Sequence, residues 1–348
     1  MAIYFLPQAD LRGMCAARQG TSTFAPVSTE HLAWVDVIDP ESFMQALSEP
    51  RPSQSPKGFL LPAAESMGEY GSGAKAASVA TESPPLVLIG VRACELRARN
   101  YLDQVLLEGE AEDPLYRQRR EATTIVSCDC VDCADSCFCT LVGGEPFPTD
   151  GYDVNLTPVD GGYVAEVATD RGRQWVGDDR IGRLSEATAA QLARRDELRQ
   201  GMTQRLKEQN AAFSVTASDQ SQPKLPDDND DAWQRFAADC VECGACTNIC
   251  PTCHCFYLYD QALGPAEFER VRTWDSCLFS TYHRMAGGPS MKLTPRPRLY
   301  SRLANRVLHK FTYSPQQYSL LGCVGCGRCV DACIGDIDIR EVVQELGE

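Results

Sequence analysis

The residues of this chain that could do chemistry are its cysteines, of which there are eighteen in 348 residues. Five lie between Cys128 and Cys139, six between Cys240 and Cys255, and four between Cys323 and Cys333. In a small secreted domain this density would predict disulfides, but the N-terminus lacks the basic start and long apolar segment of a secretion signal. We therefore expect a cytoplasmic protein whose thiols serve metal ligation or redox chemistry.

Two of these groups repeat one spacing, Cys-x2-Cys-x2-Cys-x3-Cys, which is the ligand run of a bacterial-type ferredoxin. Three thiolates at this spacing can curl around three corners of an iron–sulfur cube, and the glycine within each run permits the tight turn. The fourth cysteine of each run ligates the other cube. The spacing therefore predicts two [4Fe-4S] clusters, the first held by Cys240, Cys243, Cys246 and Cys333, and the second by Cys250, Cys323, Cys326 and Cys329.

Paired structural zinc sites are the alternative for these runs. Zinc usually takes two Cys-x2-Cys pairs, or mixtures of Cys and His, with a wider gap between them. Pro251 follows the first run as in ferredoxins, whereas Ile334 stands where proline is usual after the second. Iron–sulfur clusters are the better match, and a non-redox zinc scaffold is the competing function.

An insertion of residues 256–322 separates the two runs and is longer than a minimal ferredoxin needs. Its segment from Arg296 to Phe311 is basic in an otherwise acidic protein. One interpretation is a solvated helix face with ordinary charges. The other is a docking surface, or a shell of cations that offsets the negative charge of the cubes.

A third set of cysteines follows two predicted strands. Cys94 comes just after the apolar run of residues 85–92 and opens a predicted helix, and the group from Cys128 to Cys139 follows the run of residues 122–128. Cysteines at strand ends converge on one edge of an α/β sheet, where ligand sites form. Amides at a helix start favour a thiolate or an anionic cluster. We expect a ligand site at this edge, with buried or incidental thiols as the alternative.

Hydrophobic patterning predicts the elements that position these cysteines. We expect strands over 31–38, 85–92 and 122–128, and helices over 40–47, 95–107 and 185–213, the last capped by Ser185. Residues 49–85 are rich in Pro, Ser, Gly and Ala and predict a surface loop with a short strand over 58–62. Residues 214–231 predict an acidic linker.

The expected fold class is an α/β N-terminal domain plus an α+β bacterial-type dicluster ferredoxin domain with a long insertion. The first domain spans 1–184 and carries a non-standard [4Fe-4S] site. Residues 185–231 form the helix and acidic linker, and the ferredoxin-like domain spans 232–348.

Composition argues against several other functions. The net charge of −15 argues against nucleic acid as a partner, because phosphate binding needs a basic patch. The longest apolar runs are far short of the ~20 residues of a membrane span. No Gly-x-Gly-x-x-Gly motif follows a predicted strand, and no nucleophile–base set can be assigned. We interpret the chain as a non-catalytic electron-transfer subunit of an oxidoreductase complex.

Segments spread along the chain resemble one known family. They are GVRACELRA, DPLYRQRRE, DSCFCT, GYDVNLT, WDSC and the two ferredoxin runs. This set is similar to the iron–sulfur β subunit of cytoplasmic NAD(P)-linked [NiFe] hydrogenases, the sulfhydrogenases. The A subunit of anaerobic sulfite reductase is a close relative, and a similar subunit accompanies the flavin oxidoreductase partners of heterodisulfide reductase.

The resemblance implies a third, irregularly spaced [4Fe-4S] cluster in the N-terminal domain, so that the chain would hold three. Matched to the family's motifs, its ligands are Cys94, Cys130, Cys137 and Cys139. Cys128 or Cys133 could replace Cys130 in this set. Arg92 and Arg97 are candidates for cofactor-binding donors that tune the potential, with ordinary surface charges as the alternative.

Besides Cys128 and Cys133, four cysteines have no assignment: Cys15, Cys253, Cys255 and Cys277. The last three lie in segments similar to family motifs, and we interpret them as packing thiols near the ferredoxin pair. A fourth cluster would need one further ligand and is not predicted.

The resemblance also implies partners. The chain is expected to relay electrons between a flavin/NAD(P)H-binding subunit and the catalytic subunit of a cytoplasmic [NiFe] hydrogenase complex. The alternative is the equivalent subunit of an anaerobic siroheme sulfite reductase, or of a flavin oxidoreductase linked to heterodisulfide reductase.

Overall fold

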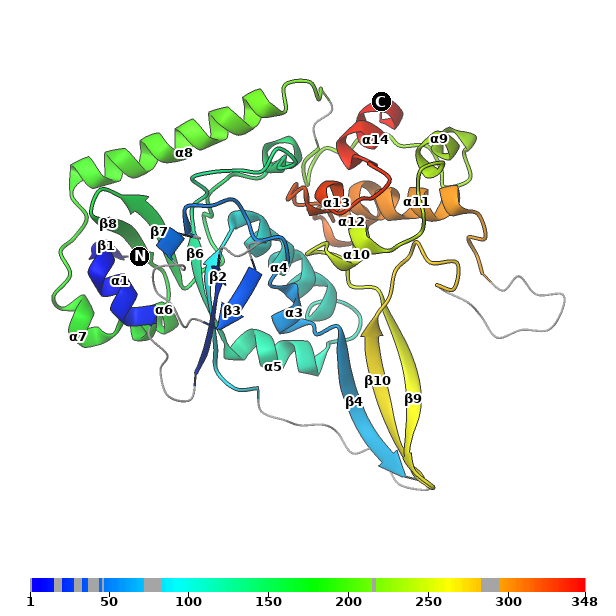
Figure 1. Cartoon of the computed structure of the whole chain (residues 1–348), viewed down its shortest axis with the longest axis horizontal. Helices are drawn as coiled ribbons and strands as arrows, with labels where there is room; N and C mark the ends of the chain where they lie inside the picture. The colour runs from blue at the N-terminus through cyan, green and yellow to red at the C-terminus, as the bar shows by residue number, and fades with distance from the viewer. Residues whose placement is uncertain are drawn as a thin grey trace.

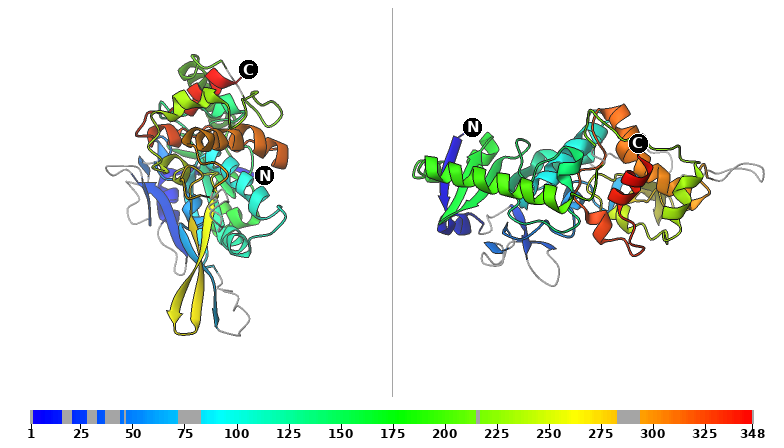
Figure 2. Two further views of the ribbon diagram at one scale, coloured as in Figure 1. Left: turned by 90° about the vertical axis from the view of Figure 1, so that its right-hand side faces the viewer. Right: turned by 90° about the horizontal axis from the view of Figure 1, so that it is seen from above.

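The computed structural model describes residues 2–15, 21–27, 33–36, 44–45, 47–71, 83–214, 217–282 and 294–347. An α/β domain holds the N-terminus at one end of the molecule, and a mostly helical domain holds the C-terminus at the other (Figure 1). A long helix, α8, lies along the α/β domain and leads towards the helical one (Figure 2).

The α/β domain is built on a seven-stranded mixed sheet with the strand order β1-β8-β7-β6-β5-β2-β3. The strands are β1 Ala2–Pro7, β2 Ser22–Val27, β3 Ala33–Asp36, β5 Leu86–Val91, β6 Thr123–Cys128, β7 Val154–Val159 and β8 Gly162–Val167. β2, β5, β6 and β7 pair in parallel, and the other three strands are antiparallel to their neighbours. Because β5 and β6 are parallel neighbours, the segments that follow them emerge at the same edge of the sheet.

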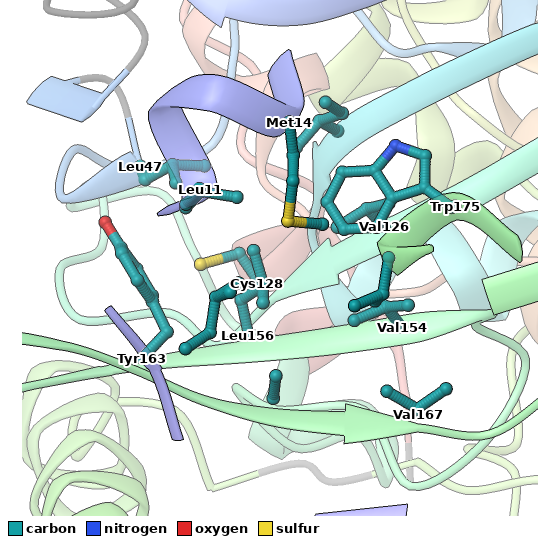
Figure 3. Close-up of a cluster of buried hydrophobic side chains, with 14 of the residues drawn as sticks. Leu11, Met14, Leu47, Val126, Cys128, Val154, Leu156, Tyr163, Val167 and Trp175 are labelled. Atoms are coloured by element: carbon teal, nitrogen blue, oxygen red, sulfur yellow. The ribbon is translucent and has the colours of Figure 1, made fainter. Parts of the chain in front are cut away.

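Helices cover both faces of this sheet. On one face α1 (Gln8–Cys15) and α6 (Asp170–Val176) close over a core that includes Trp175 (Figure 3). On the other face α4 (Ala93–Leu106) packs Leu96 against β5 and β6. Apolar side chains alternate along β5 between the two cores, as a strand buried on both faces requires. The remaining helices of the domain are α5 Pro114–Ala122, η1 Cys139–Val142 and α7 Asp178–Ile181.

Helix α8 (Ala189–Gln209) begins after Thr188, whose side chain takes part in a capping box. The predicted cap at Ser185 is wrong, because the chain around Ser185 is held against β1 by backbone hydrogen bonds. Arg199 anchors the helix to the sheet through an ion pair of 2.7 Å with Asp129. The long helix is therefore fixed above the strand ends that carry the third cysteine set.

A second sheet has three strands in the order β4-β10-β9 and projects as an arm (Figure 1, Figure 2). β9 (Phe256–Gly264) and β10 (Glu267–Trp274) belong to the insertion between the two ferredoxin runs, whereas β4 (Ala64–Gly71) comes from the N-terminal part of the chain. Arg272 of β10 forms a buried ion pair of 2.5 Å with Glu65 of β4. The two parts of the chain are therefore joined by a shared sheet.

The surface loop predicted over 49–85, with a short strand over 58–62, is wrong where the structure describes it. That stretch holds helix α3 (Lys57–Leu60) and strand β4, and Arg51 within it is buried. It packs against the C-terminal domain, which is why a segment rich in Pro and Ser is not a free loop. The rest of that prediction, over 72–82, lies outside the described residues, as does most of the helix predicted over 40–47.

The C-terminal domain consists of short helices around one apolar core centred on α11. They are η2 Asp231–Trp233, α9 Gln234–Ala237, α10 Ala245–Asn248, α11 Leu299–Leu308, η3 His309–Tyr313, α12 Ser314–Tyr318, α13 Arg328–Asp331 and α14 Ile339–Leu346. Among the helices in the described ranges, none is long and apolar enough to cross a membrane.

Candidate functional site

The first predicted cysteine set comes together in the C-terminal domain. Cys240, Cys243, Cys246 and Cys333 line one hollow. The run turns tightly at Gly244, which has a φ of +71° and lies so close to Phe279 that a Cβ would meet its ring at 2.7 Å. Glycine at this position therefore permits the tight turn by which the run surrounds the pocket.

The second set is also brought together. Cys250 lies close enough to Cys326 and Cys329 that its charge would raise the pKa of both thiols. Cys323 is similarly near Cys329 and Cys326. The fourth cysteine of each run thus lies with the first three of the other run, which is the exchange that the ferredoxin spacing predicts.

Two thiols of the second set, Cys323 and Cys329, carry a negative charge unfavourably unless a metal is bound. Burial raises the pKa of Cys323 to about 12 and that of Cys329 to about 11. A neutral thiol is a poor ligand, whereas iron binding releases its proton and supplies the missing positive charge. The donor chemistry therefore fits a metal-bound state.

Arg306 of α11 lies between the two sets. Its burial alone would lower the pKa of the guanidinium, but the thiolates of Cys246 and Cys329 raise it well above its usual value. Its Nε is buried and has no hydrogen-bond partner within the described part of the chain. A buried cation with one unsatisfied donor, beside Cys246 and Cys329, fits anionic clusters on both sides.

Lys310 repeats this arrangement at the second set. Its buried ammonium donates hydrogen bonds to Cys250 Sγ at 3.2 Å, Thr252 Oγ1 at 3.0 Å and the carbonyl oxygen of Gly322 at 3.1 Å. Arg306 and Lys310 both belong to the basic segment from Arg296 to Phe311. Of the two interpretations of that segment, the contacts favour cations that offset the charge of the cubes, since neither side chain is solvated.

The third set assembles at the edge of the main sheet. Cys94 is the second residue of α4, directly after β5, and Cys130 follows β6. A negative charge on Cys130 would raise the pKa of Cys94, and charges on Cys130 and Cys137 would raise the pKa of Cys139. Burial raises the pKa of Cys130 to about 12, so this set also needs a compensating positive charge. The four cysteines named by the family resemblance are thus neighbours in space.

Of the two alternative ligands, only Cys128 is placed apart from Cys130. Cys128 has no solvent exposure and packs among the apolar side chains beneath α1 and beside Leu156 (Figure 3). Cys133 Sγ donates a hydrogen bond of 3.3 Å to Gln209 Oε1. The geometry therefore favours Cys130 over Cys128, which is packed in the core under α1, whereas Cys133 also packs with Cys130, Cys137 and Cys139 and stays an alternative.

The two predicted arginines hold the backbone around the third set. Arg92 is 1% exposed and donates from Nη1 to the carbonyl of Asp129 at 3.1 Å. Arg97 donates from Nη2 to the carbonyl of Val142 at 3.0 Å. Their charges act on the thiols of Cys130 and Cys139, respectively. The alternative that Arg92 is an ordinary surface charge is wrong.

Two further buried arginines were not predicted. Arg51 bonds to the carbonyl oxygen of Cys326 and forms an ion pair of 2.7 Å with Asp331. Arg328 pairs with Glu95, and its charge acts on the thiols of both Cys94 and Cys326. Arg328 could have been suspected from its place inside the second cysteine run. Arg51 could not, because only the folded chain brings it there.

The third set directly adjoins the second. The amide of Phe138 donates to the carbonyl of Gly325 at 2.8 Å. Gly325 has a φ of +66°, and a Cβ on it would lie 2.5 Å from the Cα of Cys139. Only glycine allows the two backbones to approach this closely.

Three of the unassigned cysteines lie together elsewhere. Cys253, Cys255 and Cys277 line a cavity of about 440 Å³. The side chain of Cys15 lies outside what the structure describes.

The zinc alternative finds no support in this geometry. Among the described residues, no group of three or more His, Cys, Asp or Glu side chains is arranged to hold a single metal ion. A cube separates its ligands further than one zinc ion does, because each thiolate binds a different iron.

Comparison with known proteins agrees with this picture. Residues 239–337 match the family described as a 4Fe-4S dicluster domain. The chain is also 29% identical over 265 residues to the sulfhydrogenase 2 subunit beta of Pyrococcus furiosus, an alignment that covers 75% of this chain and 74% of the relative. No solved structure matches the chain. The predicted resemblance to a sulfhydrogenase β subunit is confirmed, and the chain carries a domain that binds 4Fe-4S clusters.

Proposed function

From this homology to a sulfhydrogenase β subunit, we propose that the chain relays electrons between a flavin/NAD(P)H-binding subunit and a catalytic [NiFe] hydrogenase subunit. The observation that carries the proposal is the contiguity of the three cysteine sets. The first and second sets share Arg306, and the second adjoins the third through Gly325. A chain of neighbouring sites is what a relay needs, and it does not require bond-making residues of its own.

We assign ligands by these sets. Cys240, Cys243, Cys246 and Cys333 would hold one cluster, Cys250, Cys323, Cys326 and Cys329 a second, and Cys94, Cys130, Cys137 and Cys139 a third. Each cluster, when bound, supplies a site that accepts and releases one electron. The ferredoxin pair rests on spacing and geometry together, and the third cluster on geometry and the family resemblance.

The buried cations have a role in this proposal. A positive charge close to a site favours its reduced state, because reduction adds negative charge. Lys310 acts on the second set, Arg306 on the first and second, and Arg92 and Arg97 on the third. These side chains would tune the relative potentials along the relay.

The test is to purify the native complex without oxygen and identify its subunits. A nickel-binding large subunit together with a flavin subunit is the expected composition. Electron transfer from NAD(P)H to the catalytic subunit should require this chain, whereas partial reactions at either end alone should not. A siroheme subunit in place of the nickel subunit would refute the assigned partner while leaving the relay intact. A colourless protein with zinc and no iron would refute the relay itself.

A further inference from the structure

The cavity that Cys253, Cys255 and Cys277 line lies at the base of the projecting arm, and none of the twelve cysteines of the three ligand sets lines it. Cys255 directly precedes β9, and Cys277 follows closely after β10. Pairing of those strands brings the two segments together, and the amide of Asp275 donates to the carbonyl of Cys255 at 2.9 Å. The fold therefore positions these three thiols on one cavity wall, although two separate segments of the chain supply them.

The spacing of the thiols suits several metal atoms better than one. Cys255 lies within hydrogen-bonding reach of Cys277, and Cys253 is close enough for its charge to act on Cys277. Even so, no three such side chains in the described ranges are arranged for a single ion. A volume of about 440 Å³ is also far larger than one ion needs. The cavity has the thiols and the room for a polynuclear centre.

The charge around the cavity favours an anionic occupant. Arg306 and Lys310 both line it and are both buried. Lys57, also buried, donates from Nζ to the carbonyl of Cys253 at 3.0 Å. Burying cations is costly without negative charge nearby, and the Nε of Arg306 has no hydrogen-bond partner within the described chain. Thiolates carrying an iron–sulfur core would supply that negative charge.

Two imidazoles in the wall can supply a fourth donor. His254 and His309 line the cavity, with ring centroids 5.7 Å apart. Nδ1 of His254 lies 3.1 Å from the carbonyl oxygen of Thr252. When Nδ1 donates to that carbonyl, Nε2 keeps the lone pair that a metal accepts, which is the usual support of a metal-bound histidine. The further ligand that a fourth cluster needs is therefore present, but it is not a cysteine.

We propose that this cavity binds a further iron–sulfur cluster, held by Cys253, Cys255 and Cys277, with an imidazole of the wall at the remaining corner. The proposal adds a site to the proposed relay. It rests on the proposed function only in assuming that the chain carries iron–sulfur clusters. Cys253 lies within hydrogen-bonding reach of Cys250, so the new site adjoins the second set. The second set then has two neighbours besides the first, and the relay branches at that point.

The test is the iron and acid-labile sulfide content of the full-length chain, purified without oxygen. Wild-type protein should contain about sixteen of each, because four cubes hold four irons and four sulfides apiece. Cys277→Ala should lose about four iron atoms and one signal from the electron paramagnetic resonance spectrum of the reduced protein. Cys128→Ala is the matched control, since Cys128 packs in the core under α1 away from the cavity, and it should keep the wild-type content.

The outcomes separate this proposal from the proposed function. A wild-type content of about twelve iron, all of it retained in Cys277→Ala, overturns the further cluster and leaves the other three sets standing. A content of about eight overturns both this site and the third set. A disulfide between Cys255 and Cys277, seen by mass spectrometry of the anaerobic protein, also overturns it. The wild-type count decides the matter even if a variant folds poorly.

The imidazole corner has its own test. His254→Ala and His309→Ala should keep the paired ferredoxin signals, and one of them should shift the resonance of the further cluster. If neither shifts it, the assignment of an imidazole is wrong, and the three cysteines alone define the site.

Discussion

The ammonium of Lys310 lies 3.2 Å from Cys250 Sγ in the interior of the protein. No exposed lysine could influence this thiolate as strongly, because water would screen its charge. Burial alone would lower the pKa of Lys310, but the thiolates of Cys250 and Cys253 raise it well above its usual value. The ammonium therefore stays charged and can act on the electron affinity of the second site.

Lys310→Met should lower the reduction potential of the second cluster by roughly 50–100 mV, the scale expected for loss of one nearby buried charge. Methionine keeps the length of the side chain and removes only the charge. Redox titration followed by electron paramagnetic resonance measures the shift. Lys224→Met, at an exposed lysine of the linker, is the control and should leave the potentials unchanged. Equal potentials in wild type and Lys310→Met would show that this ammonium does not tune the site.

Cys246→Ser and Cys329→Ser should each remove one cluster of the ferredoxin pair. Each residue belongs to a set that ties the two distant runs together, so losing it also weakens the fold of the C-terminal domain. Iron content should fall by about four atoms per chain, and the spin–spin interaction between the paired clusters should disappear. Retention of every cluster and of full electron transfer in either variant would falsify the ligand assignment.

Cys94→Ser should remove the third cluster and leave the paired ferredoxin signals. The loss should be about four iron atoms per chain. Transfer between the outer subunits should stop while reactions at one end alone continue. Because Cys94 and Cys277 serve different sites, the double variant should lose the sum of the two single losses. A Cys94→Ser protein with unchanged iron and normal transfer would make Cys94 a packing thiol.

Cys130→Ser and Cys128→Ala should differ sharply, although only one residue separates them. Cys130 faces the third set, so Cys130→Ser should lose that cluster. Cys128 packs in the core under α1, so Cys128→Ala should keep all iron and lose about 1 kcal/mol of unfolding free energy. Iron assay and denaturant unfolding measure the two effects. Iron loss in Cys128→Ala, with Cys130→Ser unaffected, would reverse the assignment.

Removal of iron should unfold the C-terminal domain before the α/β domain. The former has short helices packed around its cysteine sets, whereas the latter has a seven-stranded sheet with its own core. Anaerobic treatment with a chelator, followed by limited proteolysis, should release fragments from residues 232–347 while the sheet stays resistant. Simultaneous digestion of both domains would show that the sheet, too, depends on the clusters.

The cysteine spacing by itself determined the ferredoxin pair, including the exchange of the fourth cysteine between the runs. This was possible because three ligands of each cube are local in sequence, and local spacing survives folding. The neighbourhood of Cys94 and Cys130 could also be predicted, since parallel strands such as β5 and β6 end at one sheet edge.

Only the tertiary structure separated Cys128 from Cys130. Cys128 ends strand β6 and Cys130 follows that strand, and the spacing of the cysteines allows either residue to be a ligand. The fold buries Cys128 in the core under α1 and packs Cys130 with Cys137 and Cys139. This difference depends on where the strand ends, and the sequence pattern does not fix that end to a single residue.

The tertiary structure also decided which cations serve the sites and that a further cavity exists. Arg51 contacts Cys326 across 275 residues of chain, and Arg272 joins Glu65 across 207. Contacts of this length leave no local pattern, because only folding brings the two residues together. The pairing of β9 with β10 builds the base of the arm, where Cys253, Cys255 and Cys277 meet.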